Sequence, residues 1–232
     1  MTRISYKFAN SPILFVAPHG HSSDDYNTDV IAECAAKEIQ ANYLVNNGFK
    51  RGPTALPEND IGDCNNYQHC THQEILEEFL EPYIKICKRC VKYFGRCFVV
   101  WIHGVSDSIR NTQETKNLDM ILGYGMGNPH SLSCYEGIVN KFIYELKSDK
   151  LECFIGKPGG KYSGFDKKNM NQYWRKIDIQ AKIQSFQLEV IKELRSDRII
   201  SELTAASIAD CVEACIDHPN FKLPNHITVK YI

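Results

Sequence analysis

The sequence predicts an α/β fold in which helices cover both faces of a mostly parallel or mixed central sheet, a three-layer α/β/α domain. Two unbroken apolar runs, residues 13–17 and 97–102, have the composition of strands that are covered on both faces. Segments with apolar residues at helical spacing separate these runs, and such alternation is typical of parallel sheets. The 232 residues suit one domain with a sizeable core, so we expect a single domain over residues 1–232.

The composition argues against several classes of partner. The net charge is -1, and no basic segment for nucleic acid or for a membrane surface is evident. No apolar stretch approaches the roughly 20 residues of a membrane span, and the N-terminus lacks a charged-then-apolar targeting pattern. We therefore expect a cytoplasmic protein that binds neither nucleic acid nor membranes.

The ten cysteines are spread along a chain too large to need disulfides, so free thiols are expected. Cys87 with Cys90, and Cys211 with Cys215, have spacings that face one way on a helix, where thiols can bind a metal or form a redox pair. Core packing is the favoured prediction, because cysteine is among the most buried residue types. The strand-then-helix context of a thioredoxin-like motif is also absent.

The remaining elements follow from periodicity and turn residues. The expected elements, in order, are a lead-in over 1–12, the first strand, a helix over 27–45, a loop over 49–66, a helix over 71–94, the second strand, a strand over 119–122, a loop over 123–130, a helix over 133–146, a strand over 153–155, a strand within 179–189, a helix over 197–216 and a closing strand over 227–232. Thr71 and Glu74 have the spacing of a capping box, and Pro82 predicts a kink or a break into two helices.

Metal-binding side chains follow the first strand, which Pro18 ends. His19, His21, Asp24 and Asp25 come within seven residues, at the carboxyl end where open α/β sheets place their sites. Imidazole and carboxylate at short spacing suit zinc, with His19 as anchor and Asp25 reaching back from the helix start. One of the two adjacent aspartates orients a ligand instead of binding the ion, and which one does so stays open. Ordinary loop and helix-cap roles are the alternative.

The second apolar run also ends in a His-Gly pair, His103-Gly104, as the first ends in His19-Gly20. If the two strands are parallel neighbours, both imidazoles emerge at one edge of the sheet and can share one ion. Glu189 would lie at the carboxyl end of a later strand. A carboxylate there can act as general base toward a water whose pKa zinc lowers to roughly 7. Simple solvation of Glu189 is the alternative.

Three stretches carry a resemblance to a known family. They are Ala17-Pro18-His19-Gly20 with His21-x-x-x-Asp25 and Thr28, Trp101-Ile102-His103-Gly104, and Gly159-Gly160 with Phe186-Gln187-Leu188-Glu189. Together they resemble the N-formylglutamate amidohydrolase family, a branch of the zinc-carboxypeptidase-like α/β proteins, and more loosely the poly-γ-glutamate hydrolases. The resemblance implies a zinc-carboxypeptidase-like fold, zinc at His19, Asp25 and His103, and Glu189 as general base.

One stretch departs from the family pattern. The family carries Asp-x-Asn-Arg, whose Arg helps to hold a substrate carboxylate, whereas this chain has Asp63-Cys64-Asn65-Asn66, with Asn66 in the position of the Arg. An amide lacks the charged, bidentate fork of a guanidinium. Arg51, Arg110 and Lys161 lie in loops that could supply the charge, and the choice among them stays open. The residues expected to contact substrate are His21, Asp24, Asn65, Asn66, Gly160 and Lys161.

The leading hypothesis is a zinc-dependent amidohydrolase. It would cleave the amide bond of a small N-acyl (N-formyl) amino acid or related glutamyl compound, so the expected partner is a small acidic molecule. The competing class is a non-catalytic protein of the same fold that binds a small ligand, because fold does not fix function. A thiol-redox role for the helical cysteines is a third hypothesis. The sequence leaves the oligomeric state and the physiological substrate open.

Overall fold

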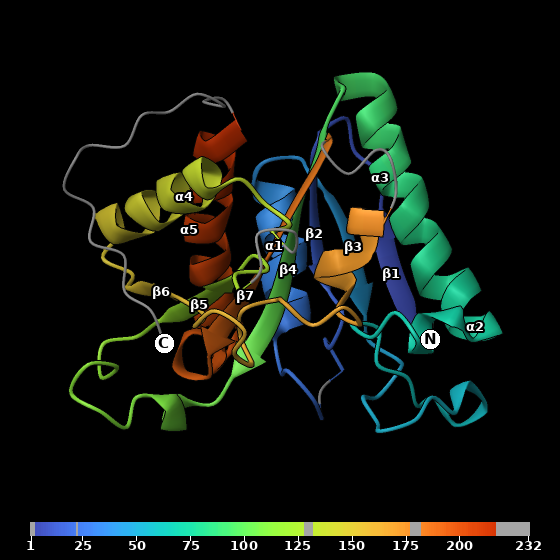
Figure 1. Cartoon of the computed structure of the whole chain (residues 1–232), viewed down its shortest axis with the longest axis horizontal. Coiled ribbons are helices and arrows are strands. Elements are labelled where there is room, and N and C mark those ends of the chain that lie inside the picture. The colour runs from blue at the N-terminus through green and yellow to red at the C-terminus, as the bar shows by residue number, and fades with distance from the viewer. Residues whose placement is uncertain (1–2, 22, 128–131, 177–181, 217–232) are drawn as a thin grey trace.

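The computed structural model describes residues 3–21, 23–127, 132–176 and 182–216. These residues form a seven-stranded sheet in the order β1-β3-β2-β4-β7-β5-β6, with helices on both faces (Figure 1). The strands are β1 Ile4–Lys7, β2 Ile13–Ala17, β3 Asn42–Asn46, β4 Cys97–Val105, β5 Met120–Gly123, β6 Cys153–Ile155 and β7 Ile183–Ile191. The α-helices are α1 Thr28–Glu38, α2 Gln73–Ile75, α3 Glu81–Phe94, α4 Glu136–Ser148 and α5 Arg198–Ile216. The predicted three-layer α/β/α architecture is confirmed, and the strand expected over 227–232 lies outside the described residues.

The sheet is mixed. β2 lies between β3 and β4 and runs parallel to both, and β4 runs parallel to β7. β1 and β5 run antiparallel to their neighbours β3 and β7. Every residue of β2 is buried, as expected for a strand covered on both faces. None of the described helices is both long and apolar enough to cross a membrane.

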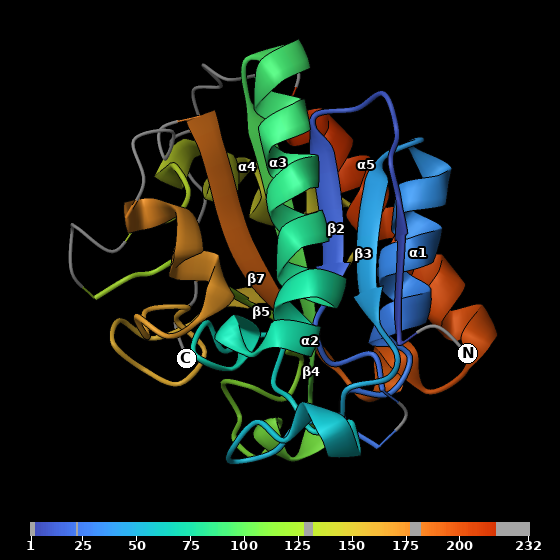
Figure 2. The same ribbon diagram turned by 90° about the vertical axis from the view of Figure 1, so that its right-hand side faces the viewer.

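Alternate residues of β2 belong to two separate cores. Phe15 packs in the core formed with α1, α4 and α5, whereas Leu14 and Val16 pack in the core formed with α3. Figure 2 shows α3 in front of the strands and α1 and α5 behind them. The two-residue period of a strand divides its side chains in this way, so both layers of helices depend on the same short run of sequence.

Residues 42–46 form strand β3, so the prediction that they end the first helix is wrong. α1 already ends at Glu38, and the positive φ of 52° at Gln40 ends the helical geometry. β3 pairs with β1 on one edge and with β2 on the other. Pairing on both edges therefore outweighs the helical spacing of the apolar residues. β1 is a strand where only a lead-in was expected.

The helix expected over residues 71–94 changes type along its length. The single turn α2 is followed by a π-helical turn, Leu76–Leu80, before α3 begins. Pro82 follows this π-helical turn directly, in the first turn of α3, and the backbone stays helical from Gln73 to Phe94. The expected break into two helices is therefore wrong, and the change of helix type just before Pro82 is what the structure shows instead. The predicted capping box is wrong, because the Thr71 hydroxyl donates to the carbonyl of Gln68 at 2.7 Å.

All ten cysteines are unpaired thiols, as predicted. Cys87 and Cys90 lie in the core beside α3, and Cys211 and Cys215 lie in the opposite core. Core packing of both pairs is therefore confirmed. Burial raises the pKa of Cys215 to about 12, which suppresses the thiolate that redox chemistry requires.

The side chain of Asn42 anchors β3 to the segment that leads into β2. Its amide donates to the carbonyls of Ser11 and Ile13 at 2.9 and 2.7 Å, and its Oδ1 accepts from the N–H of Ala9 at 2.8 Å. Because Asn42 is 1% exposed, water cannot replace these bonds.

We predict that Asn42→Ala lowers the free energy of unfolding by about 2 to 4 kcal/mol, because it leaves buried backbone groups unsatisfied. Urea unfolding measures this loss. The control Asn59→Ala, at an exposed position, changes stability by less than about 0.5 kcal/mol. Equal urea midpoints for the two variants would contradict the anchoring role.

Candidate metal centre

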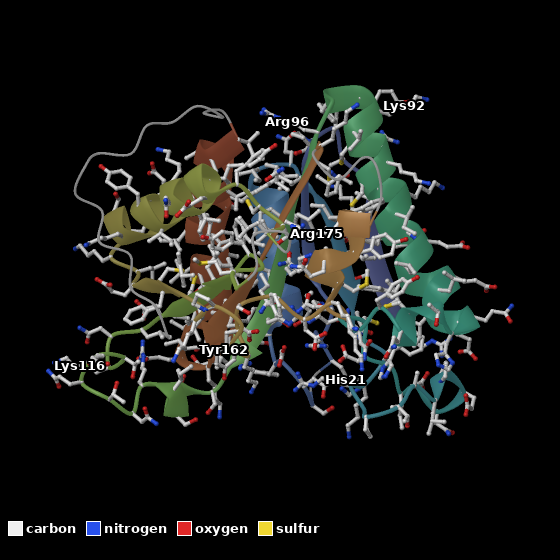
Figure 3. All side chains as sticks on the ribbon, in the orientation of Figure 1. His21, Lys92, Arg96, Lys116, Tyr162 and Arg175 are labelled. Carbon is white, nitrogen blue, oxygen red and sulfur yellow. The ribbon has the colours of Figure 1, made fainter. Side chains whose placement is uncertain are left out.

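Two imidazoles meet at the carboxyl ends of neighbouring strands. β2 and β4 pair in parallel, so both deliver their next residues to the same edge of the sheet. The Nδ1 atoms of His19 and His103 lie 3.3 Å apart, and both side chains are buried. The prediction that this pairing brings the two histidines together is confirmed, although β4 continues past His103 to Val105. Figure 3 shows this edge at the bottom of the view, with Tyr162 and His21, and Lys92 and Arg96 at the opposite end.

A turn before α1 directs Asp25 back toward these imidazoles. The N–H of Asp25 donates to the carbonyl of His19 at 3.1 Å, which closes the loop after β2. The Thr28 hydroxyl donates to the Asp25 carbonyl at 2.7 Å. Asn27 has a φ of 63°, in the left-handed region that asparagine tolerates better than most residues. These bonds fix a buried carboxylate at the start of the helix, as the sequence predicted.

The three donor atoms have the spacing of ligands around one ion. Oδ2 of Asp25 lies 3.1 Å from Nδ1 of His19 and 3.7 Å from Nδ1 of His103. A tetrahedral zinc ion about 2.0 Å from nitrogen or oxygen ligands separates those ligands by about 3.3 Å. Among the described residues, this is the group of His, Cys, Asp and Glu side chains close enough together to hold a metal.

Asp63 fixes the tautomer of His19. Its Oδ1 lies 2.7 Å from Nε2 of His19, and an ionised carboxylate can only accept, so Nε2 carries the proton. Nδ1 of His19 then presents a lone pair to the carboxylate of Asp25, an arrangement that needs a cation between them. Carboxylate–histidine–metal triads have this geometry. Asp63 is itself held by the N–H of Asn65 at 2.8 Å, and its own N–H donates to His69 at 3.1 Å.

The pKa values describe the same need for a cation. Burial lowers the pKa of His19, but hydrogen bonds with Asp25 and Asp63 outweigh burial and raise it to about 9. Burial alone would raise the pKa of Asp25 and of Asp63, yet their hydrogen bonds with the imidazoles hold both below the usual range. In the absence of a metal, a proton on His19 therefore takes the place of the ion.

His103 has no comparable partner on its far side. Its Nε2 is buried and makes no hydrogen bond with the described residues. A cation at Nδ1 leaves the proton on Nε2, so the donor set is two neutral imidazoles and one carboxylate. That set matches the ligand types of catalytic zinc sites, which keep a fourth position open. The residues present therefore fit a zinc ion.

Glu189 lies beside His103 because the two are paired positions of β7 and β4. It stands within β7, which continues to Ile191, and not at the end of the strand as expected. Nε2 of Gln187 lies 3.3 Å from Oε1 of Glu189, and Oε1 of Gln187 accepts from Asn169 at 2.9 Å. Burial raises the pKa of Glu189, which makes its carboxylate a stronger base.

A polar pocket of about 590 Å³ opens onto the three donors. Besides the donors and Glu189, the described part of its lining is Arg51, Asp63, Asn65, Gly104, Val105, Ser106, Ser108, Ile109, Asn111, Lys161, Tyr162, Asn169 and Gln187. Two cations and four side-chain amides therefore face a cavity large enough for a small polar molecule.

The structure places the expected substrate contacts in two groups. Asn65 and Lys161 line the pocket. The other four, His21, Asp24, Asn66 and Gly160, are not among the described lining residues. His21 hydrogen-bonds with Ser23, and the N–H of Gly160 donates to the carbonyl of Lys157 within its own loop. Asp24 accepts from the N–H of Arg51 at 2.7 Å, so it holds the loop that presents that cation.

The three cations considered as replacements for the family arginine are also separated by the structure. Arg51 and Lys161 line the pocket. Arg110 forms ion pairs with Asp119 and Glu193 and is not in the described lining. In addition, Nη2 of Arg51 lies 4.0 Å from Oδ1 of Asp25.

Three site residues were not predicted from the sequence. Asp63 and Gln187 had a local signal, and Asn169 had none. Asp63 belongs to the stretch that lacks the family arginine, and its Asp-x-Asn pattern, in a chain with a predicted metal site, is the signal that points to it. Gln187 stands two positions before Glu189, and strand periodicity already puts both on one face. Asn169 gave no signal, because only the fold brings it to Gln187.

No protein-family model matches the chain, and no curated protein matches it. Solved structures do match. The gene product Atu2144 from Agrobacterium tumefaciens is 10% identical with a TM-score of 0.63, over 95% of this chain and 97% of that one. N-formylglutamate amidohydrolase from Ralstonia eutropha is 14% identical with a TM-score of 0.55, over 92% and 99%. A metallo-carboxypeptidase from Pseudomonas aeruginosa is 13% identical with a TM-score of 0.51, over 92% and 60%.

The chain has the zinc-carboxypeptidase-like fold. This part of the sequence prediction is confirmed, and metal-dependent hydrolases of amide and peptide bonds share the fold. At these identities the similarity concerns the fold, so membership in the N-formylglutamate amidohydrolase family stays a prediction.

Removing metal should make stability depend on pH through His19. Its pKa of about 9 in the folded protein exceeds the ordinary 6.5, so the proton stabilises fully below pH 6.5 and this contribution is lost as pH rises through 9. The loss is roughly 3 kcal/mol. Urea unfolding of chelator-treated protein between pH 6 and pH 9.5 measures it. Saturating zinc abolishes the decline because the ion replaces the proton, and a flat metal-free profile would contradict this account.

Replacing Asp63 tests the tautomer argument. Asp63→Asn keeps the shape of the side chain but removes the charge that holds the proton on Nε2 of His19. We expect zinc to bind about 10- to 100-fold more weakly, as for other carboxylates that orient a metal-binding histidine. Competition with a chromophoric chelator measures the affinity. Asp210→Asn, at an exposed position of α5, serves as the control and should bind zinc like the wild type.

Proposed function

We propose that the protein is a zinc-dependent amidohydrolase, with zinc held by His19, Asp25 and His103. The observation that carries this proposal is the set of three buried donors at ligand spacing, with Glu189 paired across the strand from His103. Two features support it. Asp63 orients one imidazole, and a polar pocket leads from the surface to the donors.

The proposed substrate is a small N-acyl amino acid, such as an N-formyl amino acid, or a related glutamyl compound. Arg51 and Lys161 in the pocket lining offer positive charge for the carboxylate of such a molecule. Asn65 offers a buried Oδ1 that no described residue satisfies and that can accept an N–H. The pocket volume of about 590 Å³ suits a ligand of this size.

In the proposed mechanism, His19, Asp25 and His103 would hold a zinc ion, which when bound would supply a Lewis acid for the amide carbonyl and lower the pKa of a water to near 7. Glu189 accepts the proton of the attacking water and returns it to the leaving nitrogen. Gln187, fixed by Asn169, keeps Oε1 of Glu189 in place for both transfers. Partial burial keeps the carboxylate basic enough to take the proton near neutral pH.

A non-catalytic, ligand-binding protein remains the second candidate, and one observation favours it. Asn66 occupies the position of the substrate-binding arginine but is not in the described pocket lining, and its side chain accepts from the N–H of Gln68 at 3.0 Å. Such a protein would bind zinc and an acidic ligand without turnover.

Two substitutions separate metal binding from chemistry. We expect His103→Ala to lose bound zinc and hydrolysis together, because one of three ligands is gone. Glu189→Gln should retain zinc but lower kcat by about 10²- to 10⁴-fold, the usual contribution of a general base. Elemental analysis reports zinc, and release of primary amine from N-formyl and N-acetyl amino acids reports hydrolysis.

The matched controls are His72→Ala and Glu213→Gln, both at exposed positions, and both should resemble the wild type. Hydrolysis that persists in Glu189→Gln would end the assignment of that base. A wild type that binds zinc but cleaves none of the amides would favour the ligand-binding candidate.

A further inference from the structure

Arg195 is a buried cation that the proposed reaction does not use. It closes the short 3₁₀ turn Glu193–Arg195, which follows β7, and it is 7% exposed. Among the described residues its guanidinium forms no ion pair, because the ion pairs of the described arginines involve Arg3, Arg51, Arg110 and Arg198. A guanidinium stays charged at neutral pH, so its burial without a direct carboxylate partner calls for an explanation.

The guanidinium donates to three backbone carbonyls on three different segments. One NH₂ group bonds the carbonyl of Tyr26 at 2.8 Å, the other bonds that of Val105 at 3.4 Å, and Nε bonds that of Val190 at 3.2 Å. Each acceptor lies within two residues of a site residue in the chain. Tyr26 follows Asp25, Val105 is two residues after His103, and Val190 follows Glu189.

Gly104 leaves the room that this contact needs. A Cβ at Gly104 would lie 2.5 Å from Cζ of Arg195, closer than such atoms approach one another. Glycine is therefore required between His103 and Val105 for the guanidinium to reach both strands. The carbonyl of Arg195 in turn accepts from Asn27 at 3.0 Å, which ties the turn that carries Asp25 a second time.

We propose that Arg195 is a positioning residue of the metal centre, whose guanidinium clamps the segments bearing Asp25, His103 and Glu189. The inference rests on the metal site of the proposed function. Only a rigid, planar donor fork can satisfy three carbonyls that converge from different directions, and a lysine ammonium cannot reproduce that geometry. The clamp sets the distances among ligands that lie on separate elements, whereas Asp63 sets the orientation of one of them.

The test measures the metal site directly, in the full chain. Zinc affinity comes from competition with a chromophoric chelator, and the visible spectrum of the cobalt(II)-substituted protein reports ligand geometry. We expect Arg195→Met and Arg195→Lys each to weaken zinc binding by about 10- to 100-fold and to change the cobalt spectrum, as losses of outer groups around metal ligands do. Wild-type affinity in Arg195→Lys would show that charge alone suffices and would overturn the clamp.

Gly104→Ala provides an independent perturbation, because its methyl group displaces the guanidinium. It should weaken zinc binding about tenfold in the wild type but less than about twofold in Arg195→Met, where the obstructed group is gone. Equal effects in both backgrounds would mean that Gly104→Ala acts on His103 itself, and this would overturn the coupling.

Arg3→Met controls for a general loss of stability. Arg3 also bonds a backbone carbonyl and several carboxylates, those of Asp60, Glu74 and Glu78, but none of its partners belongs to the pocket. Its loss should lower the urea midpoint and leave the cobalt spectrum unchanged. If Arg3→Met changed the cobalt spectrum as Arg195→Met does, the proposed positioning role of Arg195 would be contradicted.

The outcome is separable from that of the proposed function, because no step of this test measures hydrolysis. A wild type that binds zinc but cleaves no amide would overturn the proposed hydrolase function. The zinc affinity and the cobalt spectrum would still decide the role of Arg195. A wild type that binds no zinc would overturn both.

Discussion

The parallel pairing of β2 with β4 is the constraint on which the rest of the site depends. It holds Val16 opposite Trp101. His19 follows Val16 by three positions, and His103 follows Trp101 by two. A shift of the pairing by one residue would turn His103 to the other face of the sheet. Two cores prevent such a shift, because alternate residues of both strands are buried on opposite faces. Core packing away from the site therefore fixes the relative positions of the two histidines.

The buried ionisable side chains of the candidate metal site lower the stability of the fold when no cation is present. His19, Asp25 and His103 are almost completely buried, and Asp63 and Glu189 add two further carboxylates to the same edge. Burying ionisable groups is costly unless they are paired or bind a cation. The hydrogen bonds of His19 with two carboxylates offset part of this cost when it is protonated. A divalent ion at these donors would offset it without a proton, and metal binding would then be coupled to folding.

The sequence was sufficient where local pattern and tertiary structure agree. The apolar runs of β2 and β4 are buried on both faces. The His-Gly pair after each run was enough to predict that the two histidines meet. It was insufficient where partners come from distant segments. β3 has helical spacing but lies between two strands, and that pairing is absent from any local window. Asn169 and Arg195 act through backbone and amide groups, whose positions only the assembled fold defines.

The two cations of the described pocket lining lie on loops, outside the strands that carry His103 and Glu189. Asn66, in the position of the arginine that the resembled family uses for substrate, forms a backbone bridge with Asn169. Asn169 in turn donates to Gln187, so Asn66 is linked through this bridge to the residue that hydrogen-bonds with Glu189. Positive charge enters the pocket from Arg51 on one loop and from Lys161 on another. Asp24 accepts from the N–H of Arg51, so the loop that carries this charge is tied to the turn that carries Asp25. The position of the cation therefore depends on loop contacts, whereas the meeting of the two imidazoles depends on strand pairing.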